Sequence, residues 1–241
     1  MKKIKLECIS EAVGKFHGKV KENHRYLSWE HCYRVFHDAR KQSEHTKAEI
    51  DTLCLHLAFY LASWGMYRGS SFLLQRDYKV HVPIVKEILN RDYDVLLGLK
   101  CKDFLDKAEI RERLKKLNQH LDKRYSEIRA SVVEEKHQAS IDAQANKEKS
   151  ISTVLITKVL LGTLACTPAY DRFFVDAVRK YNVTTGNYNN DSLKKLAEFY
   201  QNHSEIFKKY ETLTLQNSNL CYPQMKLLDM AFWQIGGDDR V

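Results

Sequence analysis

Glycine and proline are scarce in this chain, and their scarcity limits the folds open to it. The 241 residues include 9 Gly and 3 Pro. A fold made of many strands and tight turns needs more of both, because these residues form turns and interrupt helices. No segment shows a convincing alternation of apolar and polar residues, whereas several show apolar residues at helical spacing. We therefore expect an all-α fold.

The chain length suits one large domain or two small lobes, with enough residues to bury a real core. We expect a single all-α domain, 1–241, divided into two helical lobes. The polar, nearly aromatic-free stretch 131–150 is either the end of a long helix or a connector between the lobes.

Two segments, 49–66 and 151–166, are apolar on nearly every face, which predicts buried helices. Two shorter helices are expected within 67–90, after a turn at Arg68. In the second half, Thr167 is a candidate N-cap for a helix that has Pro168 in its first turn. The remaining expected helices are 4–22, 28–42, 102–130, 168–181, 191–213 and 222–236.

The excess of basic residues points to a polyanionic partner. Lys and Arg number 39 against 31 Asp and Glu, which gives a formal charge of +8. Such a balance is most often found in proteins that bind nucleic acid. We expect DNA as the partner, and we expect no obligate protein partner.

The cysteine pattern is typical of reduced thiols in the cytoplasm. The six Cys are widely spaced and form no CxxC pair, which argues against a disulfide framework or a zinc site. The first residues lack the sustained apolar stretch of a signal peptide, and no run is long enough to span a bilayer. We therefore expect a cytoplasmic protein without membrane association.

Lys158 and Asp171 stand at the two ends of the most hydrophobic segment of the chain. A lysine within "VLITKVLL" either extends to the surface or is buried with a partner, where it acts as an amine nucleophile or an electrostatic group. With Thr167 as the cap, Asp171 lies in the first helical turn, where the helix dipole favours a carboxylate. A carboxylate held there also suits a site that develops positive charge, such as a sugar cation.

Two stretches carry a likeness to a known family. The first runs from "TVLITK" (153–158) through one glycine, Gly162, to a Pro that precedes Asp171, and the second is "KLLDMAFWQIG" (226–236). Together they resemble the helix-hairpin-helix DNA glycosylases, and are nearest to the archaeal 8-oxoguanine DNA glycosylase branch. The likeness covers 151–181 and 222–236. Where the family's hairpin has two glycines, this chain has Gly162 alone.

The resemblance implies a hydrolase or lyase that excises a damaged or modified base from double-stranded DNA after flipping it out of the helix. It implies that Asp171 assists attack on the anomeric carbon and that Lys158 is the amine for Schiff-base chemistry. It leaves open which base is removed, whether a lyase step follows, and whether the role is repair or defence against foreign phage DNA. No HExxH, GxSxG or phosphate-binding Gly-rich loop is present, and we expect neither metal nor cofactor.

Further candidates for the base pocket or for DNA contacts come from three places. The segment "LASWGMYRGSSF" offers aromatic faces for stacking and polar groups for a base edge or a phosphate, and the C-terminal helix resembles the family's base pocket. The neighbours of Asp171 and the hairpin glycine complete the set. These candidates are Trp64, Tyr67, Arg68, Ser70, Ser71, Gly162, Tyr170, Arg172, Asp229 and Trp233.

Two other interpretations stay open. Arg25 with His31 and Arg40 with His45 resemble the Arg and His spacing of all-α ribonucleases and toxins of the HEPN type. Short pairs of this kind have low specificity. The third interpretation is a helical module that binds nucleic acid without catalysis.

Overall fold

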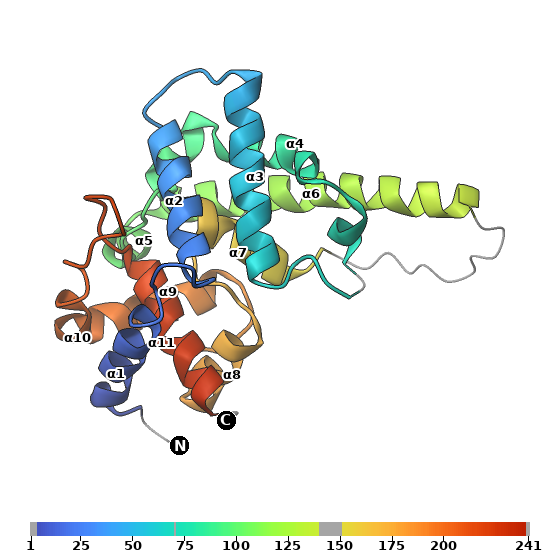
Figure 1. Cartoon of the computed structure of the whole chain (residues 1–241). Helices are drawn as coiled ribbons and strands as arrows, with labels where there is room; N and C mark the ends of the chain where they lie inside the picture. The colour runs from blue at the N-terminus through green and yellow to red at the C-terminus, as the bar shows by residue number, and fades with distance from the viewer. Residues whose placement is uncertain (1–3, 70, 140–150, 240–241) are drawn as a thin grey trace.

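The computed structural model of the chain consists of α-helices and short 3-10 helices (Figure 1). It describes residues 4–69, 71–139 and 151–239, and within these ranges the one β-type pairing is an isolated bridge between Thr214 and Cys221. The all-α prediction is confirmed. The α-helices are α1 (Leu6–His17), α2 (Leu27–Ala39), α3 (Lys47–Ser63), α4 (Val82–Ile88), α5 (Cys101–Asp106), α6 (Ala108–Ala139), α7 (Thr153–Thr163), α8 (Arg172–Lys180), α9 (Asn190–Asn202), α10 (Ser204–Lys208) and α11 (Gln224–Asp238). The 3-10 helices are η1 (Phe72–Gln75), η2 (Tyr78–His81) and η3 (Arg91–Leu96).

The two most apolar helices, α3 and α7, form much of the interior. Helix α3 begins with a capping box, in which Thr46 accepts from the amide of Glu49 and the Glu49 carboxylate accepts from the amide of Thr46. Helix α7 is buried at every residue from Leu155 to Thr163, after an exposed start. It packs against α2 and α3, which explains why its residues are apolar on nearly every face.

Helices α3 and α7 approach each other closely at Gly162. A Cβ on Gly162 would lie 2.4 Å from a ring carbon of Tyr60, so only glycine fits there without displacing that ring. Gly162 belongs to the last turn of α7. The prediction that it occupies a hairpin turn and contributes to DNA binding is therefore wrong, because the residue is buried inside a helix–helix contact.

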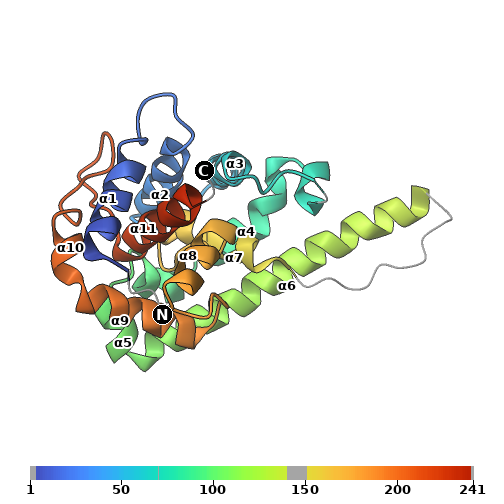
Figure 2. The same cartoon turned by 90° about the horizontal axis from the view of Figure 1, so that it is seen from below.

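Helix α11 lies between α1 and α8 (Figures 1 and 2). Its contact with α8 is closest at Gly236, where a Cβ would lie 2.0 Å from the carbonyl oxygen of Phe173. This close approach brings the first turn of α8 against the last part of α11. The two segments that carry the family likeness therefore meet in space.

The long charged helix differs from its predicted bounds. The predicted helix 102–130 is two helices, because Lys107 adopts an extended conformation between α5 and α6. The guanidinium of Arg111 donates to two carbonyls at the end of α5 and so fastens this break. The predicted helix 191–213 is likewise divided, into α9 and α10.

Helix α6 continues to Ala139, so the first part of the predicted connector 131–150 is helical, and 140–150 lie outside the described residues. Figures 1 and 2 show α6 extending away from the other helices. The division of the chain into two lobes stays a prediction. No helix in the described ranges combines the length and the apolar character needed to cross a membrane.

Candidate functional site

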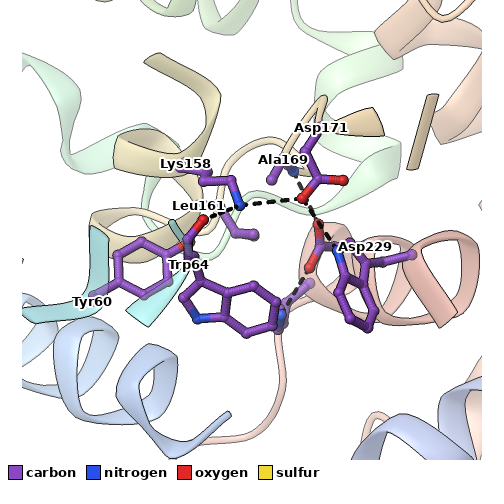
Figure 3. Close-up of a pocket in the computed structure, with 9 residues that line it drawn as sticks. Tyr60, Trp64, Lys158, Leu161, Ala169, Asp171 and Asp229 are labelled. Atoms are coloured by element: carbon purple, nitrogen blue, oxygen red, sulfur yellow. Dashed lines mark hydrogen bonds and ion pairs between the residues drawn. The ribbon is translucent and has the colours of Figure 1, made fainter. Parts of the chain in front are cut away.

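Lys158 and Asp171 are in direct contact (Figure 3). The Nζ atom of Lys158 lies 3.2 Å from Oδ2 of Asp171 and donates a second hydrogen bond, also of 3.2 Å, to the backbone carbonyl of Trp64. Its ammonium is 5.3 Å from the centre of the Trp64 ring. The side chain of Lys158 is only 5% exposed, so it does not extend to the surface. A lysine buried in this way is kept by its charge partner and its carbonyl acceptor.

Asp171 connects three elements through one carboxylate. Its Oδ1 accepts from the amide of Phe174 at 3.3 Å, which makes Asp171 the N-cap of α8. Its Oδ2 accepts from the indole of Trp233 on α11 and from Lys158 on α7, each at 3.2 Å. A carboxylate at a helix N-terminus is stabilised by the helix dipole, so its negative charge is favoured independently of the lysine.

The segment before α8 is extended, which corrects the predicted helix 168–181 and its cap at Thr167. The helix begins four residues later than expected, at Arg172. The amide of Ala169 donates to Asp229 Oδ1 at 3.0 Å, and the amide of Tyr170 donates to Thr157 Oγ1 at 3.0 Å. These two bonds to other helices hold the segment in an extended conformation until Asp171 caps α8.

A second Lys–Asp pair lies in the same place and was missed in the sequence. Lys226 and Asp229 are both on α11, with 2.8 Å between Nζ and Oδ2, and their side chains are 2% and 5% exposed. The Lys226 ammonium also lies over three rings, 4.6 Å from the centre of Phe16, 5.0 Å from Trp29 and 5.7 Å from Trp64.

Burial lowers the pKa of the Lys226 ammonium, the carboxylate of Asp229 opposes that lowering, and the nearby charge of Lys158 adds to it. Lys226 shares with Lys158 the property of a lysine in an apolar helix, and that property was its signal in the sequence. It went unnoticed because a Lys three residues before an Asp is typical of an exposed helix surface.

Two tryptophans form the aromatic walls of the site. The rings of Trp64 and Trp233 are 5.5 Å apart and meet edge to face. Trp233 makes further edge contacts with Phe16, Tyr26 and Phe173 at 5.3–5.7 Å. Both of these predicted site residues therefore line the cavity.

The two ion pairs and the two tryptophans line a small cavity of about 10 Å³, which has room for about one water molecule. The charged groups and rings fill most of the site and leave no room for a nucleobase in this conformation. Burial raises the pKa of Tyr60 in its wall well above the ordinary value, so this phenol stays neutral. Tyr60, Leu161, Ala169 and Lys226 are lining residues that the sequence did not indicate. The full lining is Tyr60, Trp64, Lys158, Leu161, Ala169, Asp171, Lys226, Asp229 and Trp233.

Of the other predicted site residues, Tyr67 and Tyr170 have partners elsewhere. The hydroxyl of Tyr67 bonds to the buried ring of His81 at 2.7 Å, and the opposite nitrogen of that ring bonds to Tyr125 at 3.1 Å. The hydroxyl of Tyr170 bonds to Ser192 at 2.9 Å. Neither tyrosine lines the cavity.

The remaining predicted residues that the structure describes do not line the cavity. Arg68 and Arg172 are exposed, and each is close in sequence to a lining residue. Ser71 caps η1 by accepting from the amide of Leu73. Ser70 lies outside the described residues.

Three residues of the ribonuclease interpretation, Arg25, His31 and Arg40, make other contacts. Arg25 donates to the carbonyl of Ser63, and His31 lies 3.5 Å from Arg34 on the same helix. Arg40 is buried, and its guanidinium bonds to Asp94 and to a backbone carbonyl of α4. Its role is therefore to join α2 to its neighbours.

The cavity combines amines, carboxylates and aromatic faces, which is a set suited to acid–base and nucleophilic chemistry on a planar, polar ligand. Among the described residues, no group of three or more His, Cys, Asp or Glu side chains is arranged to hold a metal ion. No family model, curated protein or solved structure matches this chain.

Proposed function

We propose that this protein is a DNA glycosylase that removes a damaged or modified base. The observation that carries the proposal is the contact between Lys158 and Asp171, 3.2 Å apart inside a cavity walled by Trp64 and Trp233. An amine and a carboxylate at this distance are the two groups needed to displace a base from a sugar. The aromatic walls offer stacking faces to the base.

The basic surface of the chain supports a nucleic-acid substrate. The formal charge of +8 favours a polyanion and makes its binding sensitive to salt. The narrow cavity excludes a base that is still stacked in a duplex. A nucleotide flipped out of the duplex reaches it when Trp64 or Trp233 moves and then stacks on the flipped base.

In the covalent form of the reaction, Asp171 accepts a proton from the Lys158 ammonium, and the resulting amine attacks the anomeric carbon. The bond between that carbon and the base breaks, and its electron pair leaves with the base, which takes up a proton. The bond between the anomeric carbon and the ring oxygen then breaks, its electron pair goes to that oxygen, which takes up a proton released from Nζ, and the nitrogen lone pair forms the Schiff base. In the hydrolytic form, water attacks instead, and Asp171 stabilises the cationic sugar and accepts the proton of the water.

Lys226 and Asp229 contribute to either form by placing the other groups. The Asp229 carboxylate fixes the amide of Ala169, two residues before Asp171. The Lys226 ammonium lies under Trp64 and holds Asp229 in place. Removing either one therefore disturbs both walls of the cavity.

The test is base release from a panel of duplexes that carry oxidised, deaminated, alkylated or hydroxymethylated bases. Borohydride in a parallel set reduces any Schiff base to a stable covalent adduct between protein and DNA. We expect release with the wild type and its loss in Asp171→Asn in either form of the reaction, and its loss in Lys158→Gln in the covalent form. Lys195→Gln, an exposed lysine on α9, is the matched control and keeps full activity.

Three results would contradict the proposal in different ways. Base release that survives in both Lys158→Gln and Asp171→Asn means that the site is wrong. DNA binding without turnover on any duplex indicates a non-catalytic module. RNA cleavage that is lost in His31→Ala or His45→Ala indicates the ribonuclease interpretation. An adduct trapped with borohydride separates the covalent form from the hydrolytic form.

A further inference from the structure

The segment that joins α7 to α8 has its polar backbone groups directed inward. The amide of Ala169 donates to Asp229, and the amide of Tyr170 donates to Thr157. Gly162 is packed against Tyr60 inside α7. These groups are therefore not available to bind a phosphate, as the amides of a glycine-rich turn would be. A DNA strand at the cavity must be held by other groups.

Three exposed arginines lie next to residues of the cavity. The guanidinium of Arg25 is 5.0 Å from the centre of the Trp64 ring and donates to the carbonyl of Ser63 at 3.2 Å. The guanidinium of Arg68 folds over Gly65, the residue after Trp64, and lies 3.0 Å from where a Cβ on that glycine would be. Arg172 directly follows Asp171.

Two of these guanidinium groups are placed by aromatic rings. Arg25 lies over Tyr26 at 5.4 Å as well as over Trp64. Arg172 lies over Phe173 at 5.6 Å, and Phe173 in turn contacts Trp233 at 5.3 Å. A guanidinium stacked on a ring keeps its N–H groups directed outward and loses little freedom when it binds an anion.

We propose that Arg25, Arg68 and Arg172 form an arginine rim that binds the DNA phosphates on either side of the flipped nucleotide. The inference takes its ligand from the proposed function. The planar fork of a guanidinium matches two oxygens of a phosphate, and three of them around one cavity bind the backbone on both sides of the extruded base. The rim binds the phosphates that the backbone amides between α7 and α8 are not free to bind.

The acidic residues at the end of α11 pair with lysines outside the rim. Asp238 pairs with Lys15 at 3.2 Å, and Asp239 pairs with Lys180 at 2.5 Å. Each of these carboxylates is thus neutralised by a lysine and not by a rim arginine.

The experiment measures binding of an undamaged duplex by filter binding over a series of salt concentrations, so no turnover is needed. The variant is Arg25→Gln/Arg68→Gln/Arg172→Gln. The control is Lys195→Gln/Lys208→Gln/Lys209→Gln, which removes three exposed charges from α9 and from the segment at α10. The slope of log affinity against log salt should fall by about 0.9 for each phosphate contact removed. We expect this fall in the rim variant and not in the control.

Equal slopes in the rim variant and the wild type would overturn the rim, as would an equal loss in the control. Arg68→Gln/Arg172→Gln, which leaves the Arg25 contact to α3 intact, repeats the test if the triple variant does not fold. The rim proposal and the glycosylase proposal can be rejected independently. Base release from the duplex panel with an unchanged slope rejects the rim alone, and a reduced slope without base release on any duplex rejects the enzyme alone.

Discussion

The two Lys–Asp pairs of the cavity have the same chemistry and different surroundings. Lys226–Asp229 joins two positions of one helix, and its side chains are 2% and 5% exposed. Lys158–Asp171 joins α7 to the start of α8, and its carboxylate is 16% exposed. Both pairs line the cavity, but the first lies within one helix under three aromatic rings, whereas the second lies at a junction of helices. The difference in placement matches the roles that we propose, with the first pair holding the fold and the second taking part in the reaction.

The difference teaches how one cavity can keep two buried cations. A buried ion pair costs desolvation free energy, and it persists when further hydrogen bonds satisfy it. Asp229 has the amide of Ala169 as a further donor, and Asp171 has the amide of Phe174 and the indole of Trp233. Asp229 thus fixes the backbone at Ala169, and Asp171 fixes the first turn of α8 and the ring of Trp233.

The largest effect is expected from breaking the enclosed pair. Lys226→Met leaves the Asp229 carboxylate buried without its cation, which should cost about 3–5 kcal/mol of unfolding free energy. Urea denaturation followed by circular dichroism measures it. Lys226→Met/Asp229→Leu should cost less than the single change, because it leaves one amide unpaired and no buried charge. A Lys226→Met protein as stable as the wild type would remove the distinction between the pairs.

The next effect separates reaction from stability. Asp171→Asn should lower the rate of base release in the proposed reaction by at least about 100-fold, because the carboxylate acts on the sugar. Its unfolding free energy should fall by only about 1–2 kcal/mol, since Asn also caps helices and still accepts from Lys158 or Trp233. Asp229→Asn is the matched change in the other pair. If it costs less stability than Asp171→Asn, the comparison between the pairs is wrong.

A smaller loss of stability is expected from a change that displaces Lys158–Asp171 and leaves Lys226–Asp229 in place. Gly236→Ala places a Cβ against the carbonyl of Phe173 and pushes α8 away from α11, which should cost about 1–3 kcal/mol. It should also lengthen the bond between Trp233 and Asp171 and leave Lys226–Asp229 in place. Gly237→Ala is the control, because a Cβ there meets no atom within 4 Å. Thermal unfolding measures both variants, and the midpoint should fall for Gly236→Ala and not for Gly237→Ala.

The smallest effect concerns pH. Because burial lowers the pKa of Lys226 in the folded protein, the unfolded chain binds more protons between that lowered pKa and the ordinary value of 10.5. Stability from this group therefore rises with pH through that window and is lost as pH falls through the folded pKa. We expect a gain below about 1.4 kcal/mol per pH unit.

The comparison for the pH effect is Lys226→Arg, whose guanidinium stays charged throughout the window. Urea denaturation between about pH 8 and about pH 10 should show stability rising in the wild type relative to this variant. If the unfolding free energies of the wild type and of Lys226→Arg change with pH in parallel, the pKa of Lys226 is not lowered by folding.

The buried helices could be predicted because their sequence pattern depends on burial alone. Helices α3 and α7 are apolar on nearly every face, and both were expected within a few residues of their bounds. The start of α8 could not be predicted in this way. It is set by hydrogen bonds from Ala169 to Asp229, 60 positions away, and from Tyr170 to Thr157, and no local pattern records such contacts.

The candidate site was predictable where a charge stood in an apolar run and was missed where a charge resembled a surface pair. Lys158 and Asp171 stood out for their surroundings, and so did the aromatic residues Trp64 and Trp233. Lys226 was missed, because its spacing from Asp229 is also that of an exposed ion pair. Gly162 was misassigned, because a glycine after an apolar run reads equally well as a turn and as a close helix contact.

The placement of the tryptophans has a practical consequence. The chain contains three: Trp64 and Trp233 line the cavity, and Trp29 lies next to it against Lys226. The intrinsic fluorescence of the protein therefore comes from indoles at or next to the cavity. A base that enters and stacks there should quench or shift that emission, so ligand binding can be followed in the unlabelled wild-type protein.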